Sequence, residues 1–87
     1  MPRADLTIPG ESAALTGAAS GIGRRIAAAL AGAGVDLALN DLDEGALEEA
    51  EAELAETGVE VVTVAGDASD PAVTGSLIEA AVDAFGG

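Results

Sequence analysis

The chain has 87 residues, and 49% of them are hydrophobic, although only Phe85 is aromatic. It contains neither cysteine nor histidine, which excludes disulfides, thiolate catalysis and zinc sites of the usual kind. Its net charge of −13, from 16 acidic and 3 basic residues, argues against binding to nucleic acid or to an anionic membrane.

This acidic composition has two interpretations. One is an ordinary acidic bacterial protein, and the other is a protein from a salt-rich environment, where the Debye length falls to about 3 Å at 1 M salt and self-repulsion is screened. The complete absence of lysine slightly favours the second. The opening segment, "MPRADLTIPGES", has no apolar core of the signal-peptide kind, so we expect a cytoplasmic protein.

The first half of the chain predicts one strand and one helix after a loose lead-in over residues 1–10. The short apolar run at 12–16 predicts a buried strand, and a helix is expected from Gly21 to the glycines at 32–34. The apolar residues that recur every four positions on one face of this helix are Ile22, Ile26 and Leu30.

The second half predicts two more strands and two more helices. Residues 35–40 alternate as a strand does, and Asp43 is expected to cap a helix that runs to about Thr57. Residues 59–66 are rich in β-branched side chains, and "SDP" at 69–71 is typical of an N-cap followed by proline at the first helical position. The apolar stripes expected on these helices are Leu47, Ala50 and Leu54, and then Val73, Leu77, Ala81 and Phe85, widened by Ile78 and Val82.

The order of these elements predicts the fold class. Strands that alternate with helices in the order β-α-β-α-β-α indicate an α/β fold with a parallel sheet and right-handed crossovers. No repeat or low-complexity linker interrupts the pattern. We therefore expect residues 1–87 to form one unit.

The segment "TGAASGIG", Thr16 to Gly23, places glycines between the first strand and the first helix. Exposed N–H groups and the positive end of the helix dipole make such a turn attractive to phosphate. Gly17 can form the turn, and Gly21 and Gly23 let the backbone or the helix approach a ligand or the sheet. The spacing differs from G-x-G-x-x-G, but the context of strand, turn and helix is that of a dinucleotide site.

Acidic residues follow the second and third strands. Asp41, eighteen residues after the last glycine of that segment, can accept hydrogen bonds from adenosine ribose hydroxyls and would repel a 2′-phosphate, which favours NAD over NADP. Alternatively it is a loop or cap residue, and Asp43 competes for either role. Asp67 can reach the adenine amino group across the same edge of the sheet, or can help to cap the last helix with Ser69 and Asp70.

"TGAASGIG" resembles the Thr-Gly-x-x-x-Gly-x-Gly signature of the short-chain dehydrogenase/reductase family, and "NDLDE", "GDASDP" and "AFGG" follow in that family's order. The resemblance covers about Gly10 to Gly87. It implies a three-layer Rossmann-type sheet with strand order 3-2-1, truncated before the fourth strand. The cofactor-binding residues that it implies are Gly17, Ser20, Gly21, Ile22 and Gly23 for the pyrophosphate and nicotinamide-ribose side, Asp41 and Leu42 for the adenine ribose, and Asp67 and Ala68 for the adenine ring.

The same resemblance implies what catalysis would require. Members of the family transfer hydride between a nicotinamide cofactor and an alcohol or carbonyl substrate with a Tyr-x-x-x-Lys pair, and this chain has no tyrosine and no lysine. We therefore expect the 87 residues to be inactive alone and to form the NAD-binding N-terminal portion of an oxidoreductase. The alternative is a non-catalytic nucleotide-binding or interaction module. In either case the strand at Ser12–Thr16 would be a free sheet edge, open to pairing with another copy of the chain.

Overall fold

The computed structural model describes residues 11–19 and 21–86. Its strands are β1 (Ser12–Leu15), β2 (Asp36–Asp41) and β3 (Val61–Ala65), and its helices are α1 (Gly21–Gly32), α2 (Glu44–Ala55) and α3 (Pro71–Phe85). The predicted alternation of strands and helices is confirmed. The first strand and the second helix end slightly earlier than predicted, and the lead-in predicted over residues 1–10 lies outside the described residues.

The three strands form a parallel sheet with β2 in the middle. Leu37 of β2 pairs with Ala13 of β1 on one side and with Val61 of β3 on the other. This is the predicted order 3-2-1 read from the opposite edge of the sheet. Residues 37–40 of β2 are all buried, because the strand has a neighbour on each side and helices above and below it.

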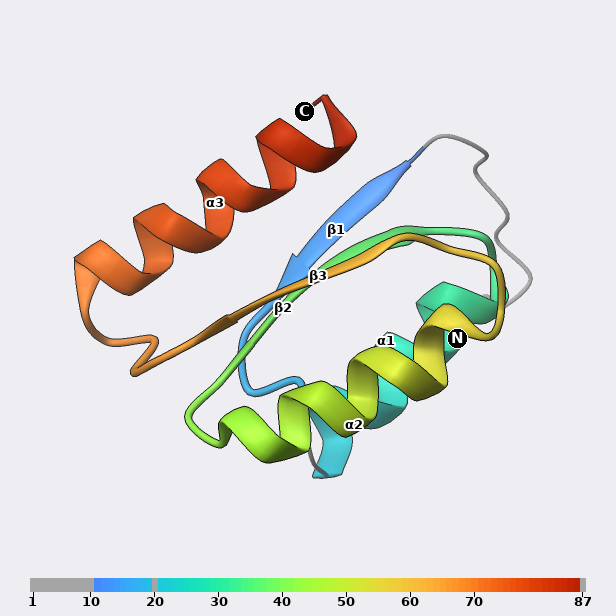
Figure 1. Cartoon of the computed structure of the whole chain (residues 1–87), viewed down its shortest axis with the longest axis horizontal. Helices are drawn as coiled ribbons and strands as arrows, with labels where there is room; N and C mark the ends of the chain where they lie inside the picture. Colours follow the sequence, from blue (N-terminus) through green and yellow to red (C-terminus); the bar gives the residue numbers. More distant parts are fainter. Residues whose placement is uncertain (1–10, 20, 87) are drawn as a thin grey trace.

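The helices divide between the two faces of the sheet, with α1 and α2 on one face and α3 on the other (Figure 1). Both crossovers from β1 to β2 and from β2 to β3 run in the same direction with the same hand, which places their helices on the same side. Alternation along β2 then sends Leu37 and Leu39 toward α1 and α2, and Ala38 and Asn40 toward α3. The predicted three-layer arrangement is confirmed.

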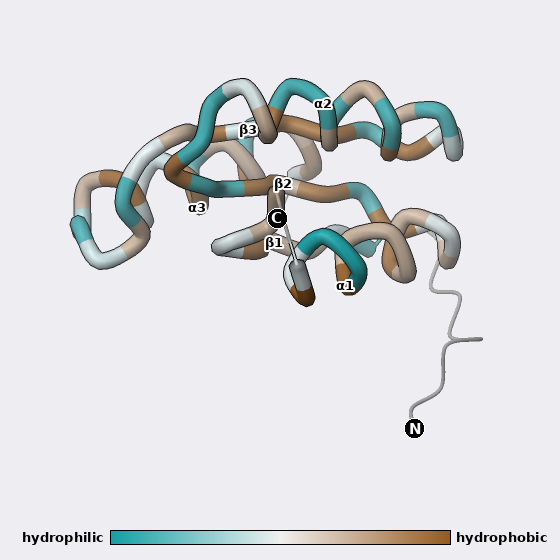
Figure 2. Tube along the Cα trace, turned by 90° about the horizontal axis from the view of Figure 1, so that it is seen from below, coloured by the Kyte–Doolittle hydropathy of each residue, from teal (hydrophilic) through white to brown (hydrophobic). Residues whose placement is uncertain are grey.

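The main core lies between the sheet and the α1–α2 layer. Its buried residues are Ala18, Ala19, Ala27, Ala31, Val35, Leu37, Leu39, Leu47, Ala50, Leu54 and Val61. The predicted apolar stripe of α2 is thus confirmed. The outer side of α2 carries hydrophilic residues, coloured teal in Figure 2, while β2 and β3 run as largely hydrophobic segments beneath it.

The buried face of α1 differs from the prediction. Ile22 and Ile26 are 73% and 46% exposed, whereas Ala27 and Ala31 are buried and Leu30 is half-buried. The helix is rotated so that its small side chains face the sheet and α2, which allows close approach of the backbones. The spacing of isoleucines therefore identified the helix but not the side that packs.

Helix α3 covers the other face of the sheet alone. Leu77 is buried and its predicted stripe partners are half-buried, but Ile78 and Val82 are 52% and 50% exposed. The predicted widening of the stripe was therefore wrong, because three strands offer a contact surface narrower than the helix's apolar side. None of the helices in the described ranges is long and apolar enough to cross a membrane.

Both predicted helix caps are present. The Asp43 side chain accepts a hydrogen bond from the Ala46 amide at 3.0 Å, at the start of α2. The Asp70 side chain accepts one from the Ala72 amide at 2.9 Å, and Pro71 follows as the first residue of α3. Each carboxylate satisfies an amide that the first helical turn leaves without a partner.

Candidate functional site

The glycine-rich turn after β1 requires glycine at three positions. Gly17 and Gly21 have φ values of 61° and 59°, in the left-handed backbone region that residues other than glycine rarely adopt. Gly23 has no space for a side chain, because a Cβ there would overlap the Gly17 carbonyl oxygen and lie 2.8 Å from its carbon. The first turn of α1 therefore packs directly onto the turn that precedes it.

Hydrogen bonds tie this turn to the end of β2. The Ala18 amide donates to the Asn40 carbonyl oxygen at 3.0 Å, and the Ala19 amide donates to Asp41 Oδ2 at 3.0 Å. On its other side, the Ala19 carbonyl accepts a bond from Arg24 Nη1 at 3.3 Å, and Arg24 Nη2 contacts Glu53 Oε1 of α2 at 2.7 Å. The turn is thus held at Ala19, whose amide donates to a carboxylate and whose carbonyl accepts from a guanidinium.

Asp41, the last residue of β2, has a fixed carboxylate. Besides the bond from Ala19, its Oδ1 accepts the Asp43 amide at 3.2 Å. The Ala19 amide, and after it the Asp43 amide, lower the pKa of the Asp41 carboxyl. The stability that these bonds contribute is present above the ordinary pKa of an aspartate and is lost as pH falls through the lowered value. A carboxylate has about four acceptor positions, so Asp41 can accept further donors.

Asp67, after β3, is also held in place by its neighbours. Its Oδ1 accepts bonds from the amide and the hydroxyl of Ser69, both at 2.8 Å, and the amide is the larger cause of the lowered pKa of the Asp67 carboxyl. The N-cap of α3 is Asp70, so Asp67 shapes the turn before the helix without capping it. Its side chain remains exposed.

Asn40 connects the ends of β2 and β3. Its side chain is buried, and Nδ2 donates to the Val64 carbonyl at 3.0 Å and to the Gly66 carbonyl at 3.1 Å. Gly66 in turn donates its amide to the Asp41 carbonyl at 3.0 Å. Glycine is required at position 66, since φ is 145° and a Cβ would lie 2.8 Å from Cγ2 of Val73.

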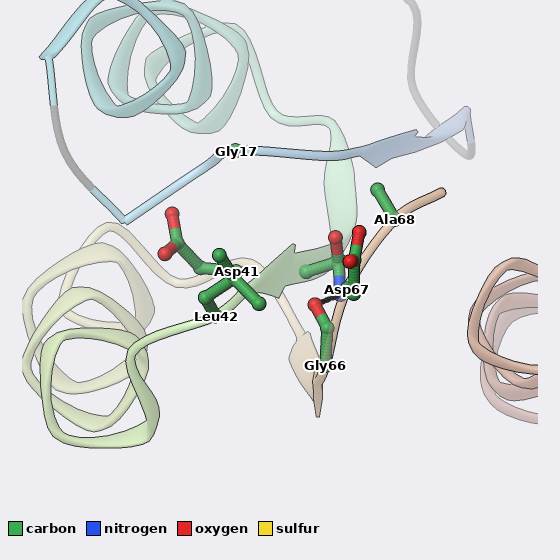
Figure 3. Close-up of a pocket in the computed structure, with 7 residues that line it drawn as sticks. Gly17, Asp41, Leu42, Gly66, Asp67 and Ala68 are labelled. Atoms are coloured by element: carbon green, nitrogen blue, oxygen red, sulfur yellow. Dashed lines mark hydrogen bonds between the residues drawn. The ribbon is translucent and has the colours of Figure 1, made fainter. Parts of the chain in front are cut away.

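These segments enclose a pocket of about 210 Å³ at the carboxyl edge of the sheet. Its lining residues are Gly17, Asn40, Asp41, Leu42, Gly66, Asp67 and Ala68. In Figure 3 the Asp41 and Asp67 side chains stand on neighbouring strand ends, with Gly17 on a third. The pocket contains two carboxylates and no basic residue, and the described part of the chain holds no cluster of three residues that could bind a metal.

The sequence prediction and the pocket overlap in large part. The structure brings together the predicted Gly17, Asp41, Leu42, Asp67 and Ala68. Gly21, Ile22 and Gly23 lie at the start of α1, beside the pocket and outside its lining, and Ser20 lies outside the described residues.

Two of the lining residues, Asn40 and Gly66, are not among the site residues predicted from the sequence. Asn40 is the last residue of the strand predicted over 35–40, and a single polar residue at a strand end does not by itself indicate a ligand site. Gly66 is the last residue of the strand predicted over 59–66. The available signal was position alone, since both residues directly precede a predicted site residue.

Comparison with known proteins identifies the family. A family model described as short chain dehydrogenase matches residues 11–87. The chain is 41% identical over 75 residues to 1-deoxy-11-beta-hydroxypentalenate dehydrogenase of Streptomyces exfoliatus. This alignment covers 86% of this chain and 27% of the relative. It is 38% identical over 76 residues to diacetyl reductase [(S)-acetoin forming] of Staphylococcus epidermidis, which covers 87% of this chain and 30% of the relative.

Solved structures agree with this match. L-sorbose reductase from Gluconobacter frateurii, complexed with NADPH and L-sorbose, superposes with a TM-score of 0.89 at 37% identity, covering 95% of this chain and 32% of that one. A short chain dehydrogenase/reductase from Burkholderia phymatum, in complex with NAD, gives 0.86 at 42% identity, covering 93% and 29%. The chain spans less than a third of the length of these relatives. It belongs to the short-chain dehydrogenase/reductase family.

Proposed function

We propose that residues 1–87 are a nucleotide-binding unit, the N-terminal portion of an NAD-dependent short-chain dehydrogenase/reductase. The observation that carries this proposal is the Asp41 carboxylate, held at 3.0 Å by the Ala19 amide of the glycine turn and facing the pocket. The nicotinamide dinucleotides in the similar L-sorbose reductase and Burkholderia structures support it.

The arrangement of the segments supports a division of the ligand among them. The pocket volume of about 210 Å³ is below the range of roughly 300–1,000 Å³ for sites that enclose a drug-sized ligand, so we place only the adenosine half there. Asp41 and Leu42 would contact the ribose, and Asp67 and Ala68 the adenine ring. The remaining candidates, Gly17, Ser20, Gly21, Ile22 and Gly23, would line the pyrophosphate and nicotinamide ribose along the start of α1.

The charges around Asp41 favour NAD over NADP. A 2′-phosphate on the adenine ribose would lie beside an ionised carboxylate, and none of the lining residues is basic. Arg24, the nearest described cation to the turn, already contacts Glu53 and the Ala19 carbonyl. The negative charges of the 2′-phosphate and the Asp41 carboxylate would repel each other, and no basic residue in the pocket lining would offset this repulsion.

The whole enzyme would transfer hydride between the cofactor and an alcohol or carbonyl group. A bound nicotinamide supplies the hydride donor or acceptor, while this chain's residues bind and orient the dinucleotide. Neither tyrosine nor lysine occurs among the 87 residues, so we assign no proton-transfer step to them. The alternative, an interaction module without a ligand, predicts no saturable nucleotide binding.

Titration of the chain with NADH and NADPH tests this proposal. Wild type is expected to bind NADH at least about tenfold more tightly than NADPH, a difference in binding free energy of about 1.4 kcal/mol. Asp41→Arg should weaken NADH binding and shift the preference toward NADPH. Asp83→Arg makes the same change of charge on the exposed side of α3 and is the matched control. An unchanged ratio in Asp41→Arg would remove Asp41 from the site, and no binding of either dinucleotide would overturn the function.

A further inference from the structure

Asn40 is the one buried polar side chain in the part of the chain that the structure describes, at 1% exposure. A buried amide is costly unless its hydrogen bonds are made. Both N–H groups of Nδ2 have acceptors, the carbonyls of Val64 and Gly66, at 3.0 and 3.1 Å. Two carbonyl oxygens at these distances require the amide nitrogen on that side, which fixes the orientation of the group.

These bonds join three segments that line the pocket. The backbone carbonyl of Asn40 accepts the amide of Ala18, in the glycine turn. Its side chain reaches across to its partner in the sheet, Val64, and one step past the end of β3 to Gly66. Asn40 therefore links the turn after β1 and the loop after β3 through a single residue of the central strand.

Two hydrogen bonds join the loop after β3 to β2, and one of them comes from the Asn40 side chain. Regular strand pairing ends at Ala65, which pairs with Asp41. Beyond it, the Gly66 amide donates to the Asp41 carbonyl, and the Gly66 carbonyl accepts from Asn40. The next residue is Asp67, whose carboxylate lines the pocket. A change in the position of Gly66 would move Asp67 directly.

We propose that Asn40 is a positioning residue for the adenosine half of the ligand, acting through the wall formed by Gly66, Asp67 and Ala68. This inference rests on the proposed function and adds a residue whose two side-chain hydrogen bonds from Nδ2 both go to backbone carbonyls at the end of β3. Its side-chain amide sets the distance between that wall and the Asp41 carboxylate. Without the amide, the Gly66 carbonyl loses its donor. The wall is then held only by the bond from the Gly66 amide to the Asp41 carbonyl and the bond from Thr74 Oγ1 to the Ala68 carbonyl, so its distance from the ribose side is less closely fixed.

The test compares Asn40→Leu, which keeps the size of the side chain and removes both donors, with Leu54→Ala, which weakens the core on α2 away from the pocket. Binding of NADH and of 5′-AMP is measured by titration, and amide hydrogen exchange is measured without ligand. Asn40→Leu is expected to weaken both ligands about tenfold and to speed exchange at Gly66 and Ser69 more than in the core. Leu54→Ala should raise exchange globally and leave the affinity of the folded protein unchanged.

The outcomes separate the two proposals. If wild type binds both ligands and Asn40→Leu binds them equally well, the role of Asn40 is overturned and the nucleotide site stands. If wild type binds neither ligand, the proposed function fails. Amide hydrogen exchange in Asn40→Leu then tests Asn40 alone. Faster exchange at Gly66 supports the role of Asn40 in positioning the wall, and an unchanged exchange rate overturns it.

Discussion

The two faces of the sheet are built from the same strands but bury different residues. Toward α1 and α2, β2 presents Leu37 and Leu39, which join the contiguous core beneath two helices. Toward α3, the same strand presents Ala38 and Asn40, and the one fully buried side chain described on the helix is Leu77. The difference indicates that one face supplies most of the stability, whereas the other contains the polar residue that organises the pocket.

The largest expected effect is on the face with two helices. Leu39→Ala removes a completely buried side chain from the main core and should lower the free energy of unfolding by about 3 kcal/mol, within the usual range for buried leucine. Urea unfolding followed by circular dichroism measures this loss. If Leu39→Ala lowers the free energy of unfolding by less than Leu77→Ala does on the α3 face, the face with two helices is not the main source of stability.

Leu77→Ala makes the same change on the face with one helix. We expect a loss of about 2 kcal/mol, near the lower end of the range, because a thin layer can collapse into the space more easily. The same urea series measures it, with Val82→Ala, at a half-exposed site on the same helix, as the control expected to lose less. Equal losses in the two variants would mean that Leu77 is not the anchor of α3.

Helix α3 can be strengthened at Gly75. A Cβ there would meet nothing within 4 Å, and the residue lies in the interior of the helix without a positive φ. Gly75→Ala should therefore stabilise the protein by about 0.5–1 kcal/mol, measured as a rise in melting temperature. Gly23→Ala, in the other helix layer, is the control and should destabilise. A fall in melting temperature for Gly75→Ala would show that the position is more crowded than the structure indicates.

The smallest effect on the monomer concerns the edge of the sheet at β1, which pairs only with β2 among the described residues. For these 87 residues taken alone, we propose that two copies associate along this side of β1, since a strand that pairs on one side is a template for further pairing. The Asp36 amide donates to the Glu11 carbonyl, so backbone groups alternate along β1 and those of Ala14 point away from β2. Ala14 is also exposed, so Ala14→Pro should change monomer stability by less than about 0.5 kcal/mol. Sedimentation over a range of concentrations should show association of wild type and not of the variant. Identical behaviour of the two would exclude pairing through this edge.

Much of the fold and part of the site were predictable from the sequence. Alternating patterns and cap residues identified the elements, and the carboxyl ends of parallel strands meet at one edge of the sheet. That rule placed Asp41 and Asp67 near each other and near Gly17, as the pocket has them. The prediction worked because these relations depend on chain order and topology, and not on details of packing.

Other features depend on how the elements rotate and approach one another. Ile22 and Ile26 are exposed because α1 turns its alanines toward the sheet, and helical spacing cannot tell which of two apolar sides will pack. Asn40 was missed because its role arises from the register between β2 and β3, which brings the Val64 and Gly66 carbonyls to its amide. A sequence gives no local signal for such a contact.

The close contact between Gly23 and Gly17 restricts how this part of the sequence can drift. A side chain at position 23 is acceptable only if the turn moves, and the turn is tied to β2 through the amide of Ala18. A substitution at position 23 would therefore have to be accompanied by a movement of the turn, which its hydrogen bond to β2 opposes. Gly32, in the same helix, has open space around it. A library of single substitutions should accordingly accept many residues at position 32 and almost none at position 23.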